Sequence, residues 1–245
     1  MHRFFVDGRG IENGTAYLAP AEAEHALRVL RLKPGDEVAL LDGLKIYRAV
    51  IADVGNGQVR CQVTEELPSP ETNLRITLYQ GLPKADKLEW IVQKCTEAGV
   101  AGIFPVSFSR SVAQVSKKDA PKKLERWQRI AMEAAKQAGR AAVPAVGPPL
   151  TLDQALAAIK GHELAVAPWE EAGSFGPLAV HEKYSHVRDV AVVIGPEGGI
   201  DPKEMALLQK EAGAVPMTMG RRIFRTETAG LAAAVALFAL WGDME

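Results

Sequence analysis

The hydrophobic pattern of the chain changes character near residue 70. Before that point, short strand-like segments are separated by the turn signals Asp42-Gly43 and Gly55-Asn-Gly57. The segments predict strands over residues 37–42, 47–54 and 58–65, and a short helix over 21–32. Several short strands around one helix predict a small β-barrel domain over residues 1–70.

After a polar segment with two prolines, Pro68–Asn73, strands and helices alternate. Strands are predicted over residues 74–80, 100–105, 164–167, 190–194 and 215–219, and helices over 87–98 and 121–139. This interleaving predicts an α/β domain over residues 71–245, with a mostly parallel sheet and helices on both of its faces.

The most informative stretch begins at Val190. The apolar run Val190–Ile194 predicts a strand buried on both faces, and it ends in Gly195-Pro-Glu-Gly-Gly199. Asp201 and Glu204 then form a capping-box pattern for a helix that Gly213 would end. A strand, a glycine-rich turn and a helix place free backbone N–H groups where open α/β sheets bind ligands. The turn matches neither the dinucleotide fingerprint nor a P-loop.

A second charged segment follows about twenty residues later. Met219–Ala229 carries Arg221, Arg222, Arg225 and Glu227, and an almost wholly apolar stretch then runs to Trp241. That stretch is too short to cross a bilayer, so it predicts a helix buried against protein. Thr226 and Thr228 are the candidate caps of this helix.

Composition excludes some classes of protein. The net charge of −1 argues against attraction of nucleic acid by the whole surface, although a local basic patch remains compatible with it. Cys61 and Cys95 lack CxxC spacing, and the histidines lack ligand spacing, so we expect a reduced cytoplasmic protein without a metal. The first residues lack the apolar core of a signal peptide.

Basic residues form candidate phosphate contacts in both domains. They are Arg3, His25, Arg28 and Arg31 in the first domain and Lys84, Lys87 and Arg140 in the second. For each of them, a solvated helix surface is the simpler interpretation of the charge alone.

Several motifs in order along the chain resemble the RsmE family, the ribosomal RNA uridine-N3 methyltransferases of the SPOUT superfamily. These motifs are Arg3-Phe-Phe-Val6, His25-Ala-Leu-Arg-Val-Leu-Arg31, Lys84-Ala-Asp-Lys-Leu-Glu89, Lys94-Cys-Thr-Glu-Ala-Gly-Val100, Glu133-Ala-Ala-Lys-Gln-Ala-Gly-Arg140, Ile194-Gly-Pro-Glu-Gly-Gly199 and Arg225-Thr-Glu-Thr-Ala229. Gly-Pro-Glu-Gly-Gly alone indicates only the superfamily. The motif Arg-Thr-Glu-Thr-Ala, together with the upstream barrel, narrows the resemblance from the superfamily to the RsmE family. Met219 stands where the family pattern leads us to expect leucine.

The resemblance implies a PUA-like RNA-binding barrel and a SPOUT domain tied in a trefoil knot, an exception to the rule that chains avoid knots. It also implies a homodimer packed through the knotted domains, and S-adenosylmethionine bound in the knot. The cofactor-binding residues would be Ile194, Gly195, Pro196, Glu197, Gly198, Gly199, Met219, Gly220, Ile223, Phe224, Thr228 and Ala229. The substrate would be one uridine of 16S ribosomal RNA, in an assembled small subunit rather than in naked RNA.

The expected chemistry assigns roles to three charged residues. Uridine N3 attacks well only once it is deprotonated, so its site needs a positive group near the two carbonyl oxygens and a route for the proton. Arg225 is the candidate for stabilising the anion. Glu227 would hold that arginine or accept the proton, and Glu197 would be a base or a structural acceptor of N–H groups.

Three other functions stay open at this point. A dinucleotide-dependent oxidoreductase would need an acidic residue about twenty positions after the glycine turn, where the chain has Val215-Pro-Met-Thr-Met219 instead. A non-catalytic RNA-binding protein would have broken motifs, and these are intact. A methyltransferase acting on another RNA, such as transfer RNA, is the nearest alternative.

Overall fold

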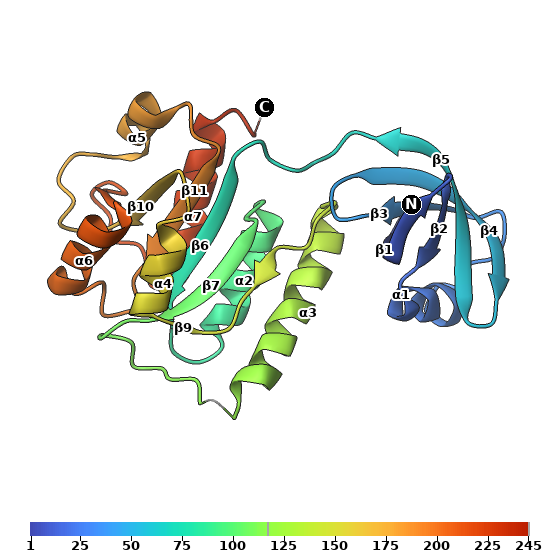
Figure 1. The fold of residues 1–245 in the computed structure, drawn as a ribbon, viewed down its shortest axis with the longest axis horizontal. Coiled ribbons are helices and arrows are strands. Elements are labelled where there is room, and N and C mark those ends of the chain that lie inside the picture. The colour runs from blue at the N-terminus through green and yellow to red at the C-terminus, as the bar shows by residue number, and fades with distance from the viewer. Residues whose placement is uncertain (117, 245) are drawn as a thin grey trace. The chain divides into compact units, whose positions relative to one another are not determined.

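The computed structural model describes residues 1–116 and 118–244, which divide into two compact units (Figure 1). The first comprises Met1–Glu71 together with Ala135–Val143. The second comprises Thr72–Ala134 and the chain from Pro144 onward. The first unit therefore includes a segment from the middle of the chain, which the sequence pattern did not reveal.

The first unit is a closed five-stranded barrel, as predicted. Its strands, in the order β1-β2-β5-β4-β3, are β1 (His2–Glu12), β2 (Thr15–Leu18), β5 (Gln58–Leu67), β4 (Ile46–Gly55) and β3 (Glu37–Leu41). β1 pairs parallel to β3, and the other neighbours are antiparallel. β1 and β2 were not predicted. They close the barrel around Phe4, Leu18, Val38 and Ile51, which are almost completely buried.

The predicted single helix of the barrel unit is two shorter elements. Helix α1 (Pro20–Glu24) continues into η1 (His25–Val29), a π-helix in which the N–H of Leu30 bonds to the carbonyl of His25. The chain leaves this turn at Arg31, whose φ of +56° is unusual for a residue other than glycine.

The segment Ala135–Val143 is fixed to the barrel unit by charged groups. The Glu71 carboxylate accepts hydrogen bonds from the Arg140 guanidinium (2.7 Å), the Ala141 N–H (2.8 Å) and the Ala142 N–H (3.1 Å). Lys136 forms an ion pair with the nearly buried Glu22. The glutamate of the predicted linker is therefore part of a packed structure.

The second unit is built on a sheet in which all pairs of neighbouring strands are parallel, which confirms the predicted class. Its order is β12-β10-β11-β6-β7-β8, with β9 also paired to β7. The strands are β6 (Arg75–Gly81), β7 (Gly102–Ser107), β8 (Ala145–Val146), β9 (Leu150–Thr151), β10 (Leu164–Pro168), β11 (Asp189–Ile194) and β12 (Val215–Met217). The trefoil knot stays a prediction.

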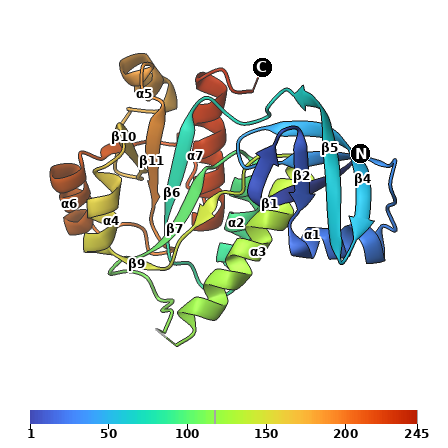
Figure 2. The same ribbon diagram turned by 45° about the vertical axis from the view of Figure 1, so that its right-hand side comes forward.

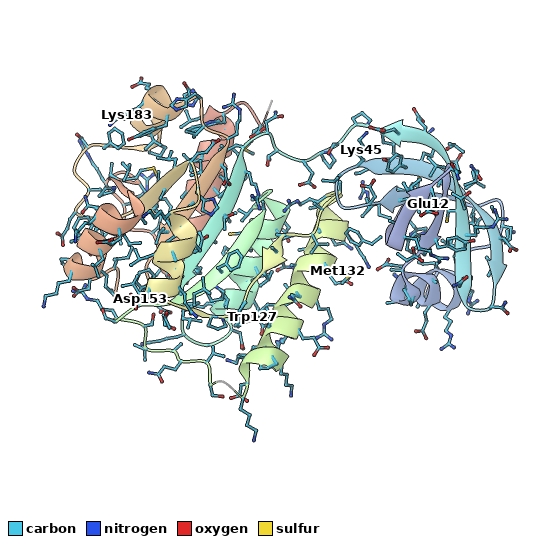
Figure 3. The ribbon with its side chains drawn as sticks, viewed as in Figure 1. Glu12, Lys45, Trp127, Met132, Asp153 and Lys183 are labelled. Carbon is cyan, nitrogen blue, oxygen red and sulfur yellow. The ribbon has the colours of Figure 1, made fainter. Side chains whose placement is uncertain are left out.

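Helices cover both faces of this sheet (Figures 1 and 2). One face packs against α2 (Lys87–Glu97), α3 (Ala120–Ala138), α5 (Pro177–Tyr184) and α7 (Thr226–Leu240), and the other against α4 (Leu152–Ile159) and α6 (Pro202–Ala212). Trp127, labelled in Figure 3, is 4% exposed in the first of these layers. The short elements β8, β9, α4 and α5 were not predicted.

Because the strands are parallel, their carboxyl ends lie along one edge of the sheet. β10, β11 and β12 end there at Pro168, Ile194 and Met217. The loops that follow approach one another: a Cβ on Gly199 would lie 3.9 Å from the Glu170 carboxylate, and the N–H of Thr218 bonds to the carbonyl of Phe175. This edge carries both motifs that the sequence singled out.

Candidate active site

The glycine-rich turn follows β11 as a compact loop. The N–H of Gly199 bonds to the carbonyl of Pro196 (2.9 Å), and Gly199 has a φ of +71°. Helix α6 begins with the predicted capping box, in which Asp201 accepts from the Lys203 N–H and Glu204 from the Asp201 N–H.

Strand β6 packs directly beneath this loop. A Cβ placed on Gly81 would lie 2.4 Å from the backbone nitrogen of Pro196 and 2.6 Å from the carbonyl carbon of Gly195. No side chain fits in that space. Gly81 therefore permits a backbone-to-backbone contact, which fixes the position of the glycine-rich turn relative to β6.

Arg110 holds the loop from the other side. Its guanidinium donates to the carbonyl of Gly198 (3.2 Å) and to the carboxylate of Asp201 (3.0 Å). The neighbouring Ser109 N–H donates to Glu204 (2.7 Å). Sequence reasoning missed Arg110, because nothing in the pattern links the end of β7 to a loop about ninety residues away.

The start of α7 is joined to the same loop through Thr226. The Thr226 hydroxyl donates to the carbonyl of Gly195 (2.6 Å) and accepts from the side-chain amide of Gln80 (2.9 Å), which also donates to the carbonyl of Gly81 (3.1 Å). The N-cap residue is Arg225, and no side chain caps the helix. The prediction that Thr226 or Thr228 caps α7 is therefore wrong, because Thr226 uses its hydroxyl to join β6 and β11.

Lys87, at the start of α2, lies between two carboxylates. Its ammonium is 3.1 Å from Glu197 in the glycine turn and 3.1 Å from Glu227 in the first turn of α7. Glu197 also accepts a hydrogen bond from the N–H of Lys84 (3.0 Å). One cation thus joins three segments that lie far apart in the sequence.

The pKa shifts in this cluster favour the charged forms of Lys87, Glu197 and Glu227. Hydrogen bonds to Glu227 and Glu197 raise the pKa of Lys87. Burial raises the pKa of Glu197, but hydrogen bonds from the Lys84 N–H, its own N–H and Lys87 outweigh burial and leave the pKa below its ordinary value. The pKa of Glu227 is lowered by its own N–H, against burial, and further by Lys87 and Arg225. A carboxylate with a lowered pKa is a weaker base, so the geometry favours the structural alternative for Glu197.

Arg225 stands apart from these ion pairs. Its side chain is exposed and, among the residues that the structure describes, its guanidinium forms no hydrogen bond or ion pair. The Glu227 carboxylate pairs with Lys87. Among residues 1–116 and 118–244 it forms no ion pair with Arg225, the contact by which it was expected to hold the arginine in place. The guanidinium is left accessible beside the loop.

The second predicted cofactor segment lies on the same edge of the sheet. Met219 packs against the core, Gly220 has a φ of +89° with open space around it, and Ile223 is 82% exposed. Thr228 and Ala229 lie in the first turn of α7 and are partly buried, as is Phe224 before it.

The residues present fit the cofactor that the resemblance implies. The backbone N–H groups of residues 221–224 have no acceptor within the described chain, and they stand at the edge to which the glycine turn also belongs. The carboxylate and the adenine ring of S-adenosylmethionine need such donors. The buried Oε1 of Gln80, an acceptor that lies beside Gly230 of α7, has no hydrogen-bond partner in the described structure.

The basic candidates for RNA contact have different surroundings. His25, Arg28, Arg31 and Lys84 are exposed, and Arg28 pairs with Glu24 on the surface. Arg3 is exposed, and its guanidinium lies against the backbone of Gly139. Two others are engaged: Arg140 is 5% exposed and bound to Glu71, and Lys87 is held by the two glutamates. The structure therefore gives Arg140 a structural role.

The described residues show neither a metal-binding cluster nor a membrane-spanning helix. They contain no group of three or more His, Cys, Asp or Glu side chains placed to hold a metal ion. None of their helices is long and apolar enough to cross a membrane.

Comparisons with known proteins agree with these observations. Residues 70–238 match the family described as RNA methyltransferase domain, and residues 18–64 match the RNA methyltransferase PUA domain. The Bacillus subtilis protein named ribosomal RNA small subunit methyltransferase E is 34% identical over 97% of this chain and 96% of its own.

Two solved structures are similar over nearly the full length. A ribosomal RNA small subunit methyltransferase E from Neisseria gonorrhoeae, bound to S-adenosyl methionine, is 30% identical over 100% of both chains with a TM-score of 0.80. A Legionella pneumophila structure in complex with the bound cofactor SAM is 32% identical, covers 97% of this chain and 96% of its own, and has a TM-score of 0.78.

Proposed function

Because this chain belongs to the ribosomal RNA small subunit methyltransferase E family, we propose that it methylates N3 of a specific uridine in 16S ribosomal RNA, using S-adenosylmethionine. The observation that carries this proposal is the arrangement at the carboxyl edge of the sheet. There the glycine turn and the start of α7 are joined through Thr226 and Lys87, and Arg225 remains accessible.

The sulfonium of S-adenosylmethionine supplies an already activated methyl group, so the protein need only position the nucleophile and favour its anion. The turn Gly195–Gly199 and the segment Met219–Phe224, with Thr228 and Ala229, would hold the cofactor. Arg225 would lie against the uracil carbonyl oxygens, where a guanidinium stabilises the negative charge that spreads from N3.

The two glutamates take positioning roles in this proposal. Glu197 and Glu227 are anions at neutral pH, as glutamates ordinarily are; their lowered pKa values make them weaker bases, and both hold Lys87. Lys87 in turn fixes the distance between the glycine turn and the first turn of α7. The N3 proton would then leave to solvent or to a group of the RNA rather than to either glutamate.

We assign RNA recognition to both units. The barrel, residues 1–70, would bind RNA through Arg3, His25, Arg28 and Arg31, and the methyltransferase domain, residues 71–245, would add Lys84. These side chains would contact phosphates, which position the RNA without specifying its sequence.

We further propose that the protein acts as a homodimer on assembled small subunits in the cytoplasm. From Ala229 onward helix α7 carries no polar side chain, and partly exposed apolar residues such as Leu231 and Val235 remain on it. A second copy packed through the knotted domain would cover them.

The test is transfer of radiolabelled methyl from S-adenosylmethionine to small subunits that lack the modification, followed by nucleoside analysis. Label recovered as 3-methyluridine supports the proposal. Labelling of transfer RNA but not of small subunits would show that the substrate is transfer RNA instead of 16S ribosomal RNA. Absence of any transfer despite cofactor binding would favour a non-catalytic RNA-binding protein.

A further inference from the structure

The first turns of helix α3 carry a group of exposed basic side chains. They are Lys122, Lys123, Arg126 and Arg129, and we call them the cationic face. Leu124 and Trp127 of the same turns pack into the core instead. Over Ala120–Arg129 the four cations stand against one carboxylate, that of Glu125. The segment therefore has a net charge of +3, in a chain whose total is −1.

Most charges of the cationic face have no partner in the part of the chain described. Arg126 forms an ion pair with Glu89 (2.7 Å), yet its side chain stays 57% exposed. The side chains of Lys122, Lys123 and Arg129 form no hydrogen bond or ion pair with any described residue. Like charges three or four positions apart on a helix repel one another. An anion bound to the cationic face would remove this repulsion.

The ion pair of Arg126 connects the cationic face to the candidate active site. Its partner Glu89 lies in the first turn of α2, and Lys87 in the same turn is 3.1 Å from Glu227. Arg225, which we assign to the uracil, is the N-cap of the helix that contains Glu227. Helices α2 and α3 both begin at the edge at which the strands of the sheet end (Figures 1 and 2). The nucleotides beside a uracil that reaches Arg225 therefore come near the cationic face.

The chemistry of the cationic face fits the phosphates of RNA. Each nucleotide carries a negative charge, and lysine and arginine side chains bind phosphates without reading the sequence. From Lys122 to Arg129 the helix rises by about 10 Å, so the face offers a row of cations and not a single one. Lys84, already assigned to RNA, stands just before the first turn of α2. The cationic face would extend that contact along the strand.

We propose that the cationic face of α3 binds phosphates of the nucleotides that flank the target uridine. The proposal rests on the function proposed above and adds a second RNA-binding surface to the methyltransferase domain. The match of this domain to an RNA methyltransferase family favours RNA over an acidic protein as the partner.

The salt dependence of RNA binding tests the proposal. The Kd of the full chain for a fluorescein-labelled oligouridylate is measured by fluorescence anisotropy between about 50 and 200 mM KCl. Each phosphate contact to a single strand contributes about 0.7 to the slope of log affinity against log salt concentration. We expect the double variant Lys122→Gln, Lys123→Gln to reduce the slope by about 1.4 and to weaken binding about tenfold at 100 mM KCl.

The matched control is the double variant Lys160→Gln, Lys210→Gln. It removes the same charge from exposed positions at the carboxyl ends of α4 and α6, which pack on the other face of the sheet. The control should bind the oligouridylate as the unmodified protein does. An equal loss in both double variants would mean that net charge alone sets the affinity, and would overturn the proposal.

Methyl transfer to small subunits gives the second readout. The Lys122→Gln, Lys123→Gln variant should raise KM about tenfold and keep kcat and cofactor affinity within about twofold, because these lysines hold RNA away from the reacting atoms.

Three other results would overturn the proposal. They are no binding of oligouridylate by the unmodified protein, an unchanged slope in the variant, and weaker methyl transfer with unchanged oligouridylate binding. The last would indicate a protein of the small subunit as the partner. If the variant loses RNA affinity as expected but the unmodified protein methylates no RNA, the proposed function fails and the RNA-binding surface stands.

Discussion

Replacing Thr226 by valine tests how the candidate site is held together. The side chain is 7% exposed, and its hydroxyl makes two hydrogen bonds, to the carbonyl of Gly195 and from the amide of Gln80. Valine keeps the shape but removes both. Each hydrogen bond contributes about 1 kcal/mol, and a buried group left without its partner costs about 1–3 kcal/mol more. We expect the free energy of unfolding to fall by about 2–4 kcal/mol.

Thr226→Ser is the matched variant, because serine keeps the hydroxyl and loses one methyl group, worth about 0.8 kcal/mol. Urea unfolding followed by tryptophan fluorescence measures both variants. The four tryptophans, Trp90, Trp127, Trp169 and Trp241, all lie in the second unit, so the signal reports the domain that contains Thr226.

Cofactor affinity gives an independent readout of the same link. If Thr226 fixes the glycine turn relative to α7, calorimetry should show about tenfold weaker binding of S-adenosylmethionine for the valine variant, equivalent to about 1.4 kcal/mol, and little change for the serine variant. A valine variant as stable as the serine variant, with unchanged cofactor affinity, would refute the reasoning.

Three further predictions concern charge and reactivity. Arg225→Ala should abolish methyl transfer while cofactor affinity stays within a few-fold, whereas unfolding of the variant, seen by circular dichroism, would make the arginine structural. The lowered pKa values of Glu197 and Glu227 contribute stability that is present above the ordinary glutamate pKa of about 4.3 and lost as pH falls through the folded values. Lys87→Met should therefore reduce the difference in unfolding free energy between pH 6 and pH 3, measured in urea, and an unchanged difference would show that Lys87 does not control these carboxylates. Burial raises the pKa of Cys95 to about 12, so iodoacetamide at pH 8 should modify this thiol only after unfolding, as peptide mass spectrometry would show.

Local patterns predicted the elements that depend on neighbouring residues. The apolar run that forms β11 and the capping box of α6 are both determined within a few positions of the chain, and the structure has both. The weak β1 and β2 segments escaped prediction because they become strands by pairing with β3 and β5, which are distant in sequence. The barrel class was still correct, since three hairpin-forming strands already indicated it.

Contacts between distant residues were the part that sequence reasoning could not supply. The sequence shows that Arg140 and Lys87 are basic. It does not show that Arg140 pairs with Glu71, or that Lys87 pairs with two glutamates. Such pairs depend on how the sheet edge brings loops together. The sequence alone therefore does not tell whether a basic side chain is available to RNA, because a carboxylate far away in the sequence can pair with it inside the fold.

Arg225, unlike Arg140 and Lys87, is a basic residue whose charge is not paired within the described part of the fold. It occupies the N-cap of α7, where the positive end of the helix dipole makes a cation unfavourable by about 0.3–1 kcal/mol. Glu227, two positions on, would be its natural partner, yet that carboxylate pairs with Lys87. Arg225 lowers the pKa of Glu227 from a distance, but its exposed guanidinium makes no ion pair in the part of the chain described. Its position is explained if the compensating negative charge arrives with the substrate, as the anion of uridine N3 would.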